Sequence, residues 1–116
     1  MCGIIVSDKK ISKEEYKFVQ NRGPDKTNEV ELNGYHFVHF LLSLTGETTP
    51  QPLIDGDILL IFNGEIYNYK DILPNAISDG YSIIQSYKIR GDEFVKYLDG
   101  EFVIILFDFS NNKFII

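Results

Sequence analysis

The sequence of 116 residues contains a single cysteine and no tryptophan. One cysteine cannot form an internal disulfide, and without a cluster of histidines and cysteines at ligand spacing it does not indicate a structural zinc site. The thiol is carried by Cys2, directly behind the initiator methionine. It is therefore either buried and inert or chemically reactive.

The chain also lacks a long hydrophobic run and an excess of positive charge. No stretch approaches the roughly 18 apolar residues that span a bilayer, and Lys9 and Lys10 follow the first apolar run, whereas a secretory signal has its basic residues before it. Eleven basic against seventeen acidic side chains give a formal charge of -6. This balance gives no electrostatic basis for binding nucleic acid or an anionic membrane. We expect a cytoplasmic protein that binds neither.

The composition is that of an ordinary globular protein. Hydrophobic residues make up 44% of the chain and charged residues 24%, and a chain of this length falls in the commonest size range for one domain. We find no linker, internal repeat or low-complexity segment. One domain over residues 1–116 is therefore expected.

Short apolar runs alternate with short helical patterns. Strands are predicted over residues 2–7, 29–32, 35–44, 58–62, 101–109 and 113–116, helices over 12–21, 78–91 and 91–100, and loops over 22–27 and 46–57. Because hairpins and helices follow one another without strict βαβ alternation, we expect stacked antiparallel sheets with helices outside. The predicted fold class is α+β.

Particular residues support these elements. Ser12 and Glu15 form a capping box at the start of the first helix, and Asn33-Gly34 is the dipeptide best suited to a two-residue hairpin turn. The two later helices each have an apolar face and end at a glycine. Their expected core residues are Ile83, Ile84 and Tyr87 in the first, and Phe94 and Leu98 in the second.

Cys2 stands where removal of Met1 would place a thiol and a free α-amine on one residue. Such an amine has an ordinary pKa of about 7.7 to 8.0. Directly or through one water, it can take the thiol proton while the sulfur attacks a carbonyl, so no histidine is needed as general base. The alternative is that Cys2 is a small residue filling the edge of the first strand.

Asn63-Gly64 follows a strongly hydrophobic run, at the expected end of a strand. An amide side chain and a glycine N–H at such a point can converge on a tetrahedral oxyanion, although the same dipeptide is also a common turn. The nearby carboxylates of Glu65 and Asp79 can hold a substrate ammonium. Alternatively, Glu65 is a solvated loop residue, and Ser78-Asp79 is an ordinary N-cap sequence.

Taken together, these stretches resemble the glutaminase domain of class II glutamine amidotransferases, in particular that of the asparagine synthetase branch. The matching pieces occur in the family's order and cover the whole chain. They are MCGI at 1–4, RGPD at 22–25, HFLLSL at 39–44, QP at 51–52, NGEIYNY at 63–69, SD at 78–79 and FVKYLDGEFVIILFD at 94–108.

The resemblance implies an N-terminal-nucleophile hydrolase fold, in which two antiparallel sheets are sandwiched between helical layers. By the same analogy Cys2 is the nucleophile, Asn63 and Gly64 form the oxyanion hole, and Glu65 and Asp79 bind the glutamine ammonium. The RGPD stretch would shape a loop near the site. The implied reaction converts glutamine to glutamate and ammonia through a glutamyl thioester, needs no metal or cofactor, and passes ammonia to a synthetase partner.

The sequence departs from the family pattern in three respects. Leu41 stands where the family has an arginine that grips the substrate α-carboxylate, and a chain that retains Met1 has no free amine on Cys2. The chain also ends where family members continue with further strands and a synthetase domain, so we expect a truncated sandwich without synthetase chemistry. Because a truncated sheet exposes an edge, a homodimer or a separate partner subunit is expected.

Two classes of function therefore stay open. One is a glutaminase, or a related amide hydrolase acting on a substrate that lacks the α-carboxylate. The other is a non-catalytic relative that keeps the fold as a binding or regulatory module, for example one that docks on a synthetase. Loss of activity in Cys2→Ala would support the first class. Partner binding unaffected by that substitution would support the second.

Overall fold

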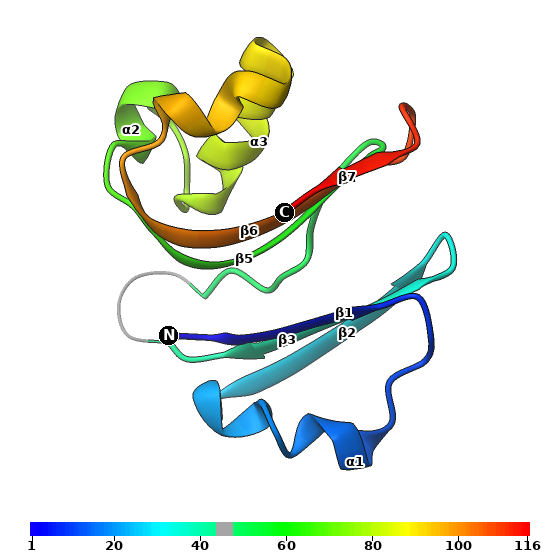
Figure 1. Cartoon of the computed structure of the whole chain (residues 1–116). Helices are drawn as coiled ribbons and strands as arrows, with labels where there is room; N and C mark the ends of the chain where they lie inside the picture. Colours follow the sequence, from blue (N-terminus) through cyan, green and yellow to red (C-terminus); the bar gives the residue numbers. More distant parts are fainter. Residues whose placement is uncertain (44–47) are drawn as a thin grey trace. The chain divides into compact units, whose positions relative to one another are not determined.

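A computed structural model describes residues 1–43 and 48–116, which form two compact units, Met1–Pro52 and Leu53–Ile116. Each unit contains one antiparallel sheet with helices on one of its faces (Figure 1). The α+β class with two antiparallel sheets is therefore confirmed, and these are the components of the sandwich that the resemblance implies. That residues 1–116 make one domain stays a prediction.

The first unit is a three-stranded sheet with short helices on one face. Its strands lie in the order β1-β3-β2, and both pairs are antiparallel. A core of aliphatic and aromatic side chains fills the space between the sheet and the helices. The elements are β1 (Gly3–Ser7), α1 (Lys13–Tyr16), the 3-10 helix η1 (Gln20–Arg22), β2 (Lys26–Leu32) and β3 (Tyr35–Leu41), and the core residues are Ile11, Tyr16, Val38 and Phe40.

The predicted hairpin and the capping box of this unit are confirmed. Asn33 and Gly34 have φ of 50° and 84°, as a two-residue turn with positive φ requires. The Ser12 N–H donates to the Glu15 carboxylate at 2.7 Å. The helix itself is shorter than the predicted 12–21, because the chain turns after Tyr16 so that Val19 can pack against the sheet.

Strand β2 begins at Lys26, three residues before the predicted start at Glu29. The prediction failed there because asparagine is depleted in strands. In the structure the Asn28 side-chain amide donates to the Gln51 carbonyl oxygen at 2.7 Å, which satisfies the polar group within the strand. Strand β3 ends at Leu41, so the prediction of a strand to Leu44 was wrong at Leu42 and Ser43, whose N–H groups bond to Cys2 Sγ and the Asp25 carboxylate; Leu44 lies outside the described residues.

The second unit is a four-stranded sheet in the order β4-β5-β6-β7. Figure 1 shows α2 and α3 over one face of the sheet, with the chain of η2 running beside them. The elements are β4 (Leu53–Asp55), β5 (Ile58–Ile66), α2 (Tyr69–Ile72), α3 (Gly80–Arg90), the 3-10 helix η2 (Gly91–Tyr97), β6 (Gly100–Asp108) and β7 (Lys113–Ile115).

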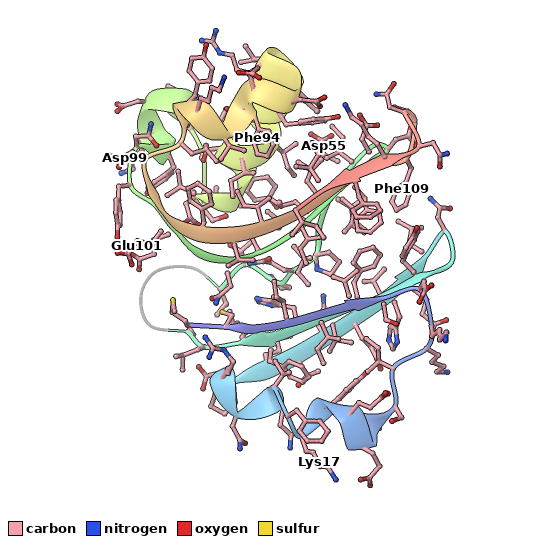
Figure 2. The ribbon with its side chains drawn as sticks, in the orientation of Figure 1. Lys17, Asp55, Phe94, Asp99, Glu101 and Phe109 are labelled. Carbon is pink, nitrogen blue, oxygen red and sulfur yellow. The ribbon has the colours of Figure 1, made fainter. Side chains whose placement is uncertain are left out.

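The core of this unit lies between α3, η2 and the sheet. As predicted, Ile83, Ile84 and Tyr87 of α3 are buried, Phe94 of η2 is fully buried, and Leu98 packs against the same cluster. The sheet contributes Leu53, Leu60, Phe62, Ile66, Ile104 and Leu106. In Figure 2, Phe94 lies between the helices and the sheet.

Three predictions for the second unit were wrong in part. The loop predicted over residues 46–57 contains β4, because Leu53 is buried and pairs with Leu60 of β5. The helix predicted over 91–100 is a 3-10 helix that ends at Tyr97. The strand predicted over 58–62 continues to Ile66, so Asn63 and Gly64 lie inside β5 and not after its end.

Candidate functional site

Cys2 lies immediately before β1 and is half-buried. The backbone N–H of Leu42 donates to Cys2 Sγ, with 3.4 Å between nitrogen and sulfur. The Arg22 Nε–H donates to the Cys2 carbonyl oxygen at 3.4 Å. The Cys2 thiol in turn donates to the Leu42 carbonyl oxygen at 3.9 Å, so Cys2 is held against the backbone that follows β3.

The RGPD stretch is held against the end of β3, beside Cys2. Gly23 packs so closely that a Cβ at this position would lie 1.9 Å from the Phe40 carbonyl oxygen. The Asp25 N–H donates to the Leu41 carbonyl at 3.0 Å, and the Asp25 carboxylate accepts the Ser43 N–H at 2.7 Å. The loop therefore fixes the backbone on which Cys2 and its hydrogen-bonding partner Leu42 depend.

Strand register defines which side chains share the face of Cys2. Gly3 pairs with Phe40, and both belong to the helix-covered face, where Phe40 is a core residue. Successive side chains on a strand point to opposite faces. One step further along both strands, Cys2 and Leu41 therefore lie opposite each other on the face without helices.

His39 lies on that same face, two residues before Leu41 in β3. It is almost fully buried, and burial lowers its pKa to about 4. Its Nε2 has no hydrogen-bond partner within the described part of the chain. His39 is therefore neutral at physiological pH and does not supply a positive charge beside Cys2.

In the second unit, Asn63 and Gly64 lie within β5, paired with Val103 and Phe102 of β6. Gly64 has φ of 140°, which side-chain-bearing residues rarely adopt, and a Cβ there would lie 1.9 Å from the Glu101 carbonyl oxygen. The two strands thus approach each other so closely that only glycine fits. This close approach explains why Asn63-Gly64, a dipeptide typical of turns, lies within a continuous strand.

Glu65 faces Glu101 directly across the β5–β6 ladder. Asp99 precedes the same end of β6, and Figure 2 labels both Asp99 and Glu101 there. The charge of Glu101, followed by burial and the charges of Glu65 and Asp99, raises the pKa of Tyr67. This end of the sheet therefore carries a negative potential that favours a cation.

Asp79 connects the start of α3 to the end of β5. Its carboxylate does not cap its own helix; Oδ2 accepts the Ile66 N–H at 3.0 Å. At the start of α3, the backbone carbonyl of Asp79 accepts the N–H of Ser82. Among the residues that the structure describes, the Ile66 N–H binds only Oδ2 and no hydrogen bond to Oδ1 of Asp79 is found.

The structure thus brings the predicted residues together in two groups, one in each unit. Cys2 lies with the RGPD loop and the end of β3, and Asp79 lies beside the strand segment that carries Asn63, Gly64 and Glu65. Sequence reasoning missed the N–H of Leu42 because a backbone donor leaves no mark in the sequence. It also missed Glu101, whose position opposite Glu65 follows only from the strand register.

Within residues 1–43 and 48–116, no group of histidine, cysteine and carboxylate side chains is arranged to hold a metal ion. None of the helices in these ranges is long and apolar enough to cross a membrane.

The whole chain, residues 1–116, matches the family described as "Glutamine amidotransferase domain". The chain belongs to this family. Among curated relatives, the "Probable asparagine synthetase [glutamine-hydrolyzing]" of Dictyostelium discoideum is 31% identical over 99% of this chain. "Asparagine synthetase [glutamine-hydrolyzing] 1" of Saccharomyces cerevisiae is 32% identical over 99%, and the nodule enzyme of Pisum sativum is 32% identical over 100%.

The chain spans only about a quarter of these relatives, with 25%, 23% and 23% of their respective lengths covered. The matched part is therefore the amidotransferase domain. The resemblance inferred from the sequence motifs is confirmed.

Proposed function

We propose that this amidotransferase domain is a glutaminase, which hydrolyses the side-chain amide of glutamine through a thioester on Cys2. The observation that carries the proposal is the setting of Cys2, whose sulfur accepts the Leu42 N–H beside the RGPD loop. Family membership over the whole chain supports glutamine as the substrate.

The first chemical step forms the thioester. After removal of Met1, the α-amine of Cys2 accepts the thiol proton while Sγ bonds to the amide carbon and the carbonyl electron pair moves to oxygen. The tetrahedral adduct then collapses, its carbon–nitrogen bond breaks, and the nitrogen takes the proton from the α-amine and leaves as ammonia. Water attacks the thioester, which releases glutamate and restores the thiol.

Asn63 and Gly64 are the proposed oxyanion hole, with the side-chain amide of the first and the backbone N–H of the second as donors. Preorganised donors of this kind act on charge that develops only in the transition state, so they stabilise it more than the substrate. The tight packing of Gly64 against β6 supports this role because it holds the backbone rigidly.

Glu65 and Asp79 are the proposed ligands of the substrate ammonium. The negative potential around Tyr67 supports this assignment for Glu65. For Asp79, the hydrogen bond from Ile66 fixes one carboxylate oxygen and orients the other. A charge-assisted hydrogen bond from ammonium to carboxylate is about twice as strong as a neutral one.

The released ammonia would serve a synthetase, because the curated relatives are named asparagine synthetases. We propose that the synthetase is either a further part of the same protein or a partner subunit. A homodimer stays a separate prediction, as does the cytoplasmic location.

The test is an intact-mass measurement before and after incubation with a diazo-ketone analogue of glutamine, which alkylates a competent N-terminal thiol. We expect loss of Met1, one covalent adduct, and ammonia release from glutamine. Cys2→Ala should remove both the adduct and the activity while keeping the fold. A protein that lacks Met1 and gives neither adduct nor ammonia would overturn the proposal.

The second candidate is a non-catalytic binding module, and Leu41 is the observation that favours it. An apolar side chain stands beside Cys2 where the family has its carboxylate-binding arginine. Loss of one partner of a desolvated charge pair costs about 2 to 5 kcal/mol. Binding of a synthetase that is unchanged by Cys2→Ala, together with an inert thiol, would support this alternative.

A further inference from the structure

We propose that Lys26 binds the α-carboxylate of glutamine and so supplies the positive charge that Leu41 does not. This inference rests on the proposed glutaminase function. It assigns the substrate class of the site: amides that carry a carboxylate at the end of the molecule opposite the reacting group.

Strand register places Lys26 beside Leu41. Lys26 pairs with Leu41 across the β2–β3 ladder. Residues directly opposite each other in an antiparallel pair share a face of the sheet, with Cβ atoms about 4.5 to 5.5 Å apart. Cys2 and Leu41 are the next residues along the chain from the paired Gly3 and Phe40. The three side chains therefore form one row across the sheet, with the thiol next to the start of β1, Leu41 in the middle and the ammonium on β2.

The alternation of contacts along β2 confirms the face of Lys26. Glu29 faces the helices, because its carboxylate accepts hydrogen bonds from Tyr16 and His36. Odd-numbered residues of β2 thus point toward the helices. Lys26 and Asn28 therefore project from the other face, together with Cys2.

The order of the three side chains in this row matches the order of the groups along a glutamine molecule. Its amide carbon must reach Cys2 Sγ, and a short aliphatic chain separates this carbon from the α-carboxylate. Adjacent strands lie about 4.8 Å apart, so Cys2 and Lys26 are separated by about 10 Å at the backbone, and the long lysine side chain can shorten that gap. Between them, Leu41 offers an apolar surface to the methylene groups of the substrate.

The charge of Lys26 is available to a ligand. Its side chain is exposed and forms no ion pair within the ranges 1–43 and 48–116. Arg22 is the other cation near Cys2, but it belongs to η1, on the helix-covered side, and its Nε is engaged by the Cys2 carbonyl. Lys26 is therefore the better placed cation on the face of the thiol.

The experiment measures glutamine binding by calorimetry and hydrolysis by ammonia release, in the full chain. The variants are Lys26→Met, Lys26→Arg, Arg22→Gln and a matched control, Lys9→Met, which removes an exposed lysine from the turn after β1. Each is also tested with 4-aminobutanamide, which is glutamine without its carboxylate. This second substrate isolates the contribution of the carboxylate.

We expect Lys26→Met to raise the Kd and KM for glutamine about tenfold, the effect of one exposed charge-assisted hydrogen bond. The Kd and KM of Lys26→Met for 4-aminobutanamide should equal those of the wild type. Lys26→Arg should bind glutamine about as well as the wild type does. The control Lys9→Met should match the wild type with both substrates. Leu41→Arg combined with Lys26→Met should also recover binding, since it returns a cation to the same row.

Each alternative outcome has a separate meaning. If glutamine is bound or hydrolysed and Lys26→Met changes nothing, the inference is wrong while the glutaminase proposal stands; an effect confined to Arg22→Gln would assign the carboxylate to Arg22. If glutamine binds in a Lys26-dependent way without hydrolysis, the inference holds and the glutaminase proposal fails. A wild type that neither binds nor hydrolyses glutamine would overturn both.

Discussion

The hydroxyl of Tyr87 in α3 donates to Asp108 Oδ2 at the end of β6, with 2.6 Å between the oxygens. Both side chains are buried. Asp108 also accepts hydrogen bonds from Ser110 and Asn111 in the turn before β7. This one carboxylate therefore joins the helix layer of the second unit to the β6–β7 hairpin.

Tyr87→Phe should lower the free energy of unfolding by about 1.5 to 3 kcal/mol, the usual value of a hydrogen bond to a charged group. The aromatic ring stays in place, so its edge-on contact with Phe94 is kept. Urea denaturation monitored by circular dichroism provides the measurement. An unchanged midpoint would show that the turn residues alone satisfy Asp108.

Asp108 should make stability depend on acid pH. The Tyr87 hydroxyl, assisted by the turn residues, holds the pKa of Asp108 well below its ordinary value of 3.8. A lowered folded-state pKa contributes stability that is present above the ordinary pKa and is lost as the pH falls through the folded value. The advantage of the wild type over Asp108→Asn should therefore shrink between about pH 4 and about pH 2.

Denaturation curves of both proteins at a series of pH values test this expectation. Asp92→Asn serves as a control because Asp92 is an exposed carboxylate whose partner is the surface residue Lys113. Exposed ion pairs contribute only about 0 to 1 kcal/mol to the free energy of unfolding. If the difference in free energy of unfolding between the wild type and Asp108→Asn stays constant down to pH 2, the lowered pKa assigned to Asp108 is contradicted.

Gly64→Ala should destabilise the second unit by at least about 3 kcal/mol, because the added methyl group would meet the Glu101 carbonyl oxygen. Gly56→Ala is the matched control. Gly56 also has a positive φ, of 60°, but a Cβ there meets nothing within 4 Å. It should lose only about 1 to 2 kcal/mol, from backbone strain. Equal losses would show that crowding at Gly64 is unimportant.

Asp79→Asn should separate charge from structure at the proposed ammonium site. The amide oxygen of asparagine can still accept the Ile66 N–H, so the melting temperature should change little. Loss of the negative charge should raise the KM for glutamine about tenfold or more. With glutarate monoamide, which is glutamine without its ammonium, Asp79→Asn and the wild type should have the same KM. That result would locate the effect at the ammonium. A KM that is equally raised for both substrates would contradict the assignment.

Strong local patterns were predicted correctly from the sequence. Asn33-Gly34 determines its own turn, and the apolar spacing of Ile83, Ile84 and Tyr87 determines which side of α3 is buried. These features depend on neighbouring residues, so a single sequence contains the information needed to predict them.

Features that depend on pairing were not predictable in this way. Asn63 and Gly64 lie within a strand because β6 approaches them from far along the sequence. The row formed by Cys2, Leu41 and Lys26 combines residues from three segments of the chain, and no spacing within one segment reveals it. Roles for the candidate residues could be proposed from the sequence, whereas their neighbours in the fold follow only from the strand register.

The glycines of β5 and β6 are reciprocal: a Cβ on Gly64 would meet the Glu101 carbonyl oxygen, and a Cβ on Gly100 would meet that of Glu65. The backbone from Asn63 to Glu65 is therefore locked into one conformation by folding itself. Ligands lose less affinity to ordering when their site is already rigid. If Asn63 and Gly64 form the proposed oxyanion hole, glutamine binding there should proceed with little loss of conformational entropy, and the Gly64 N–H should keep its position when the substrate arrives.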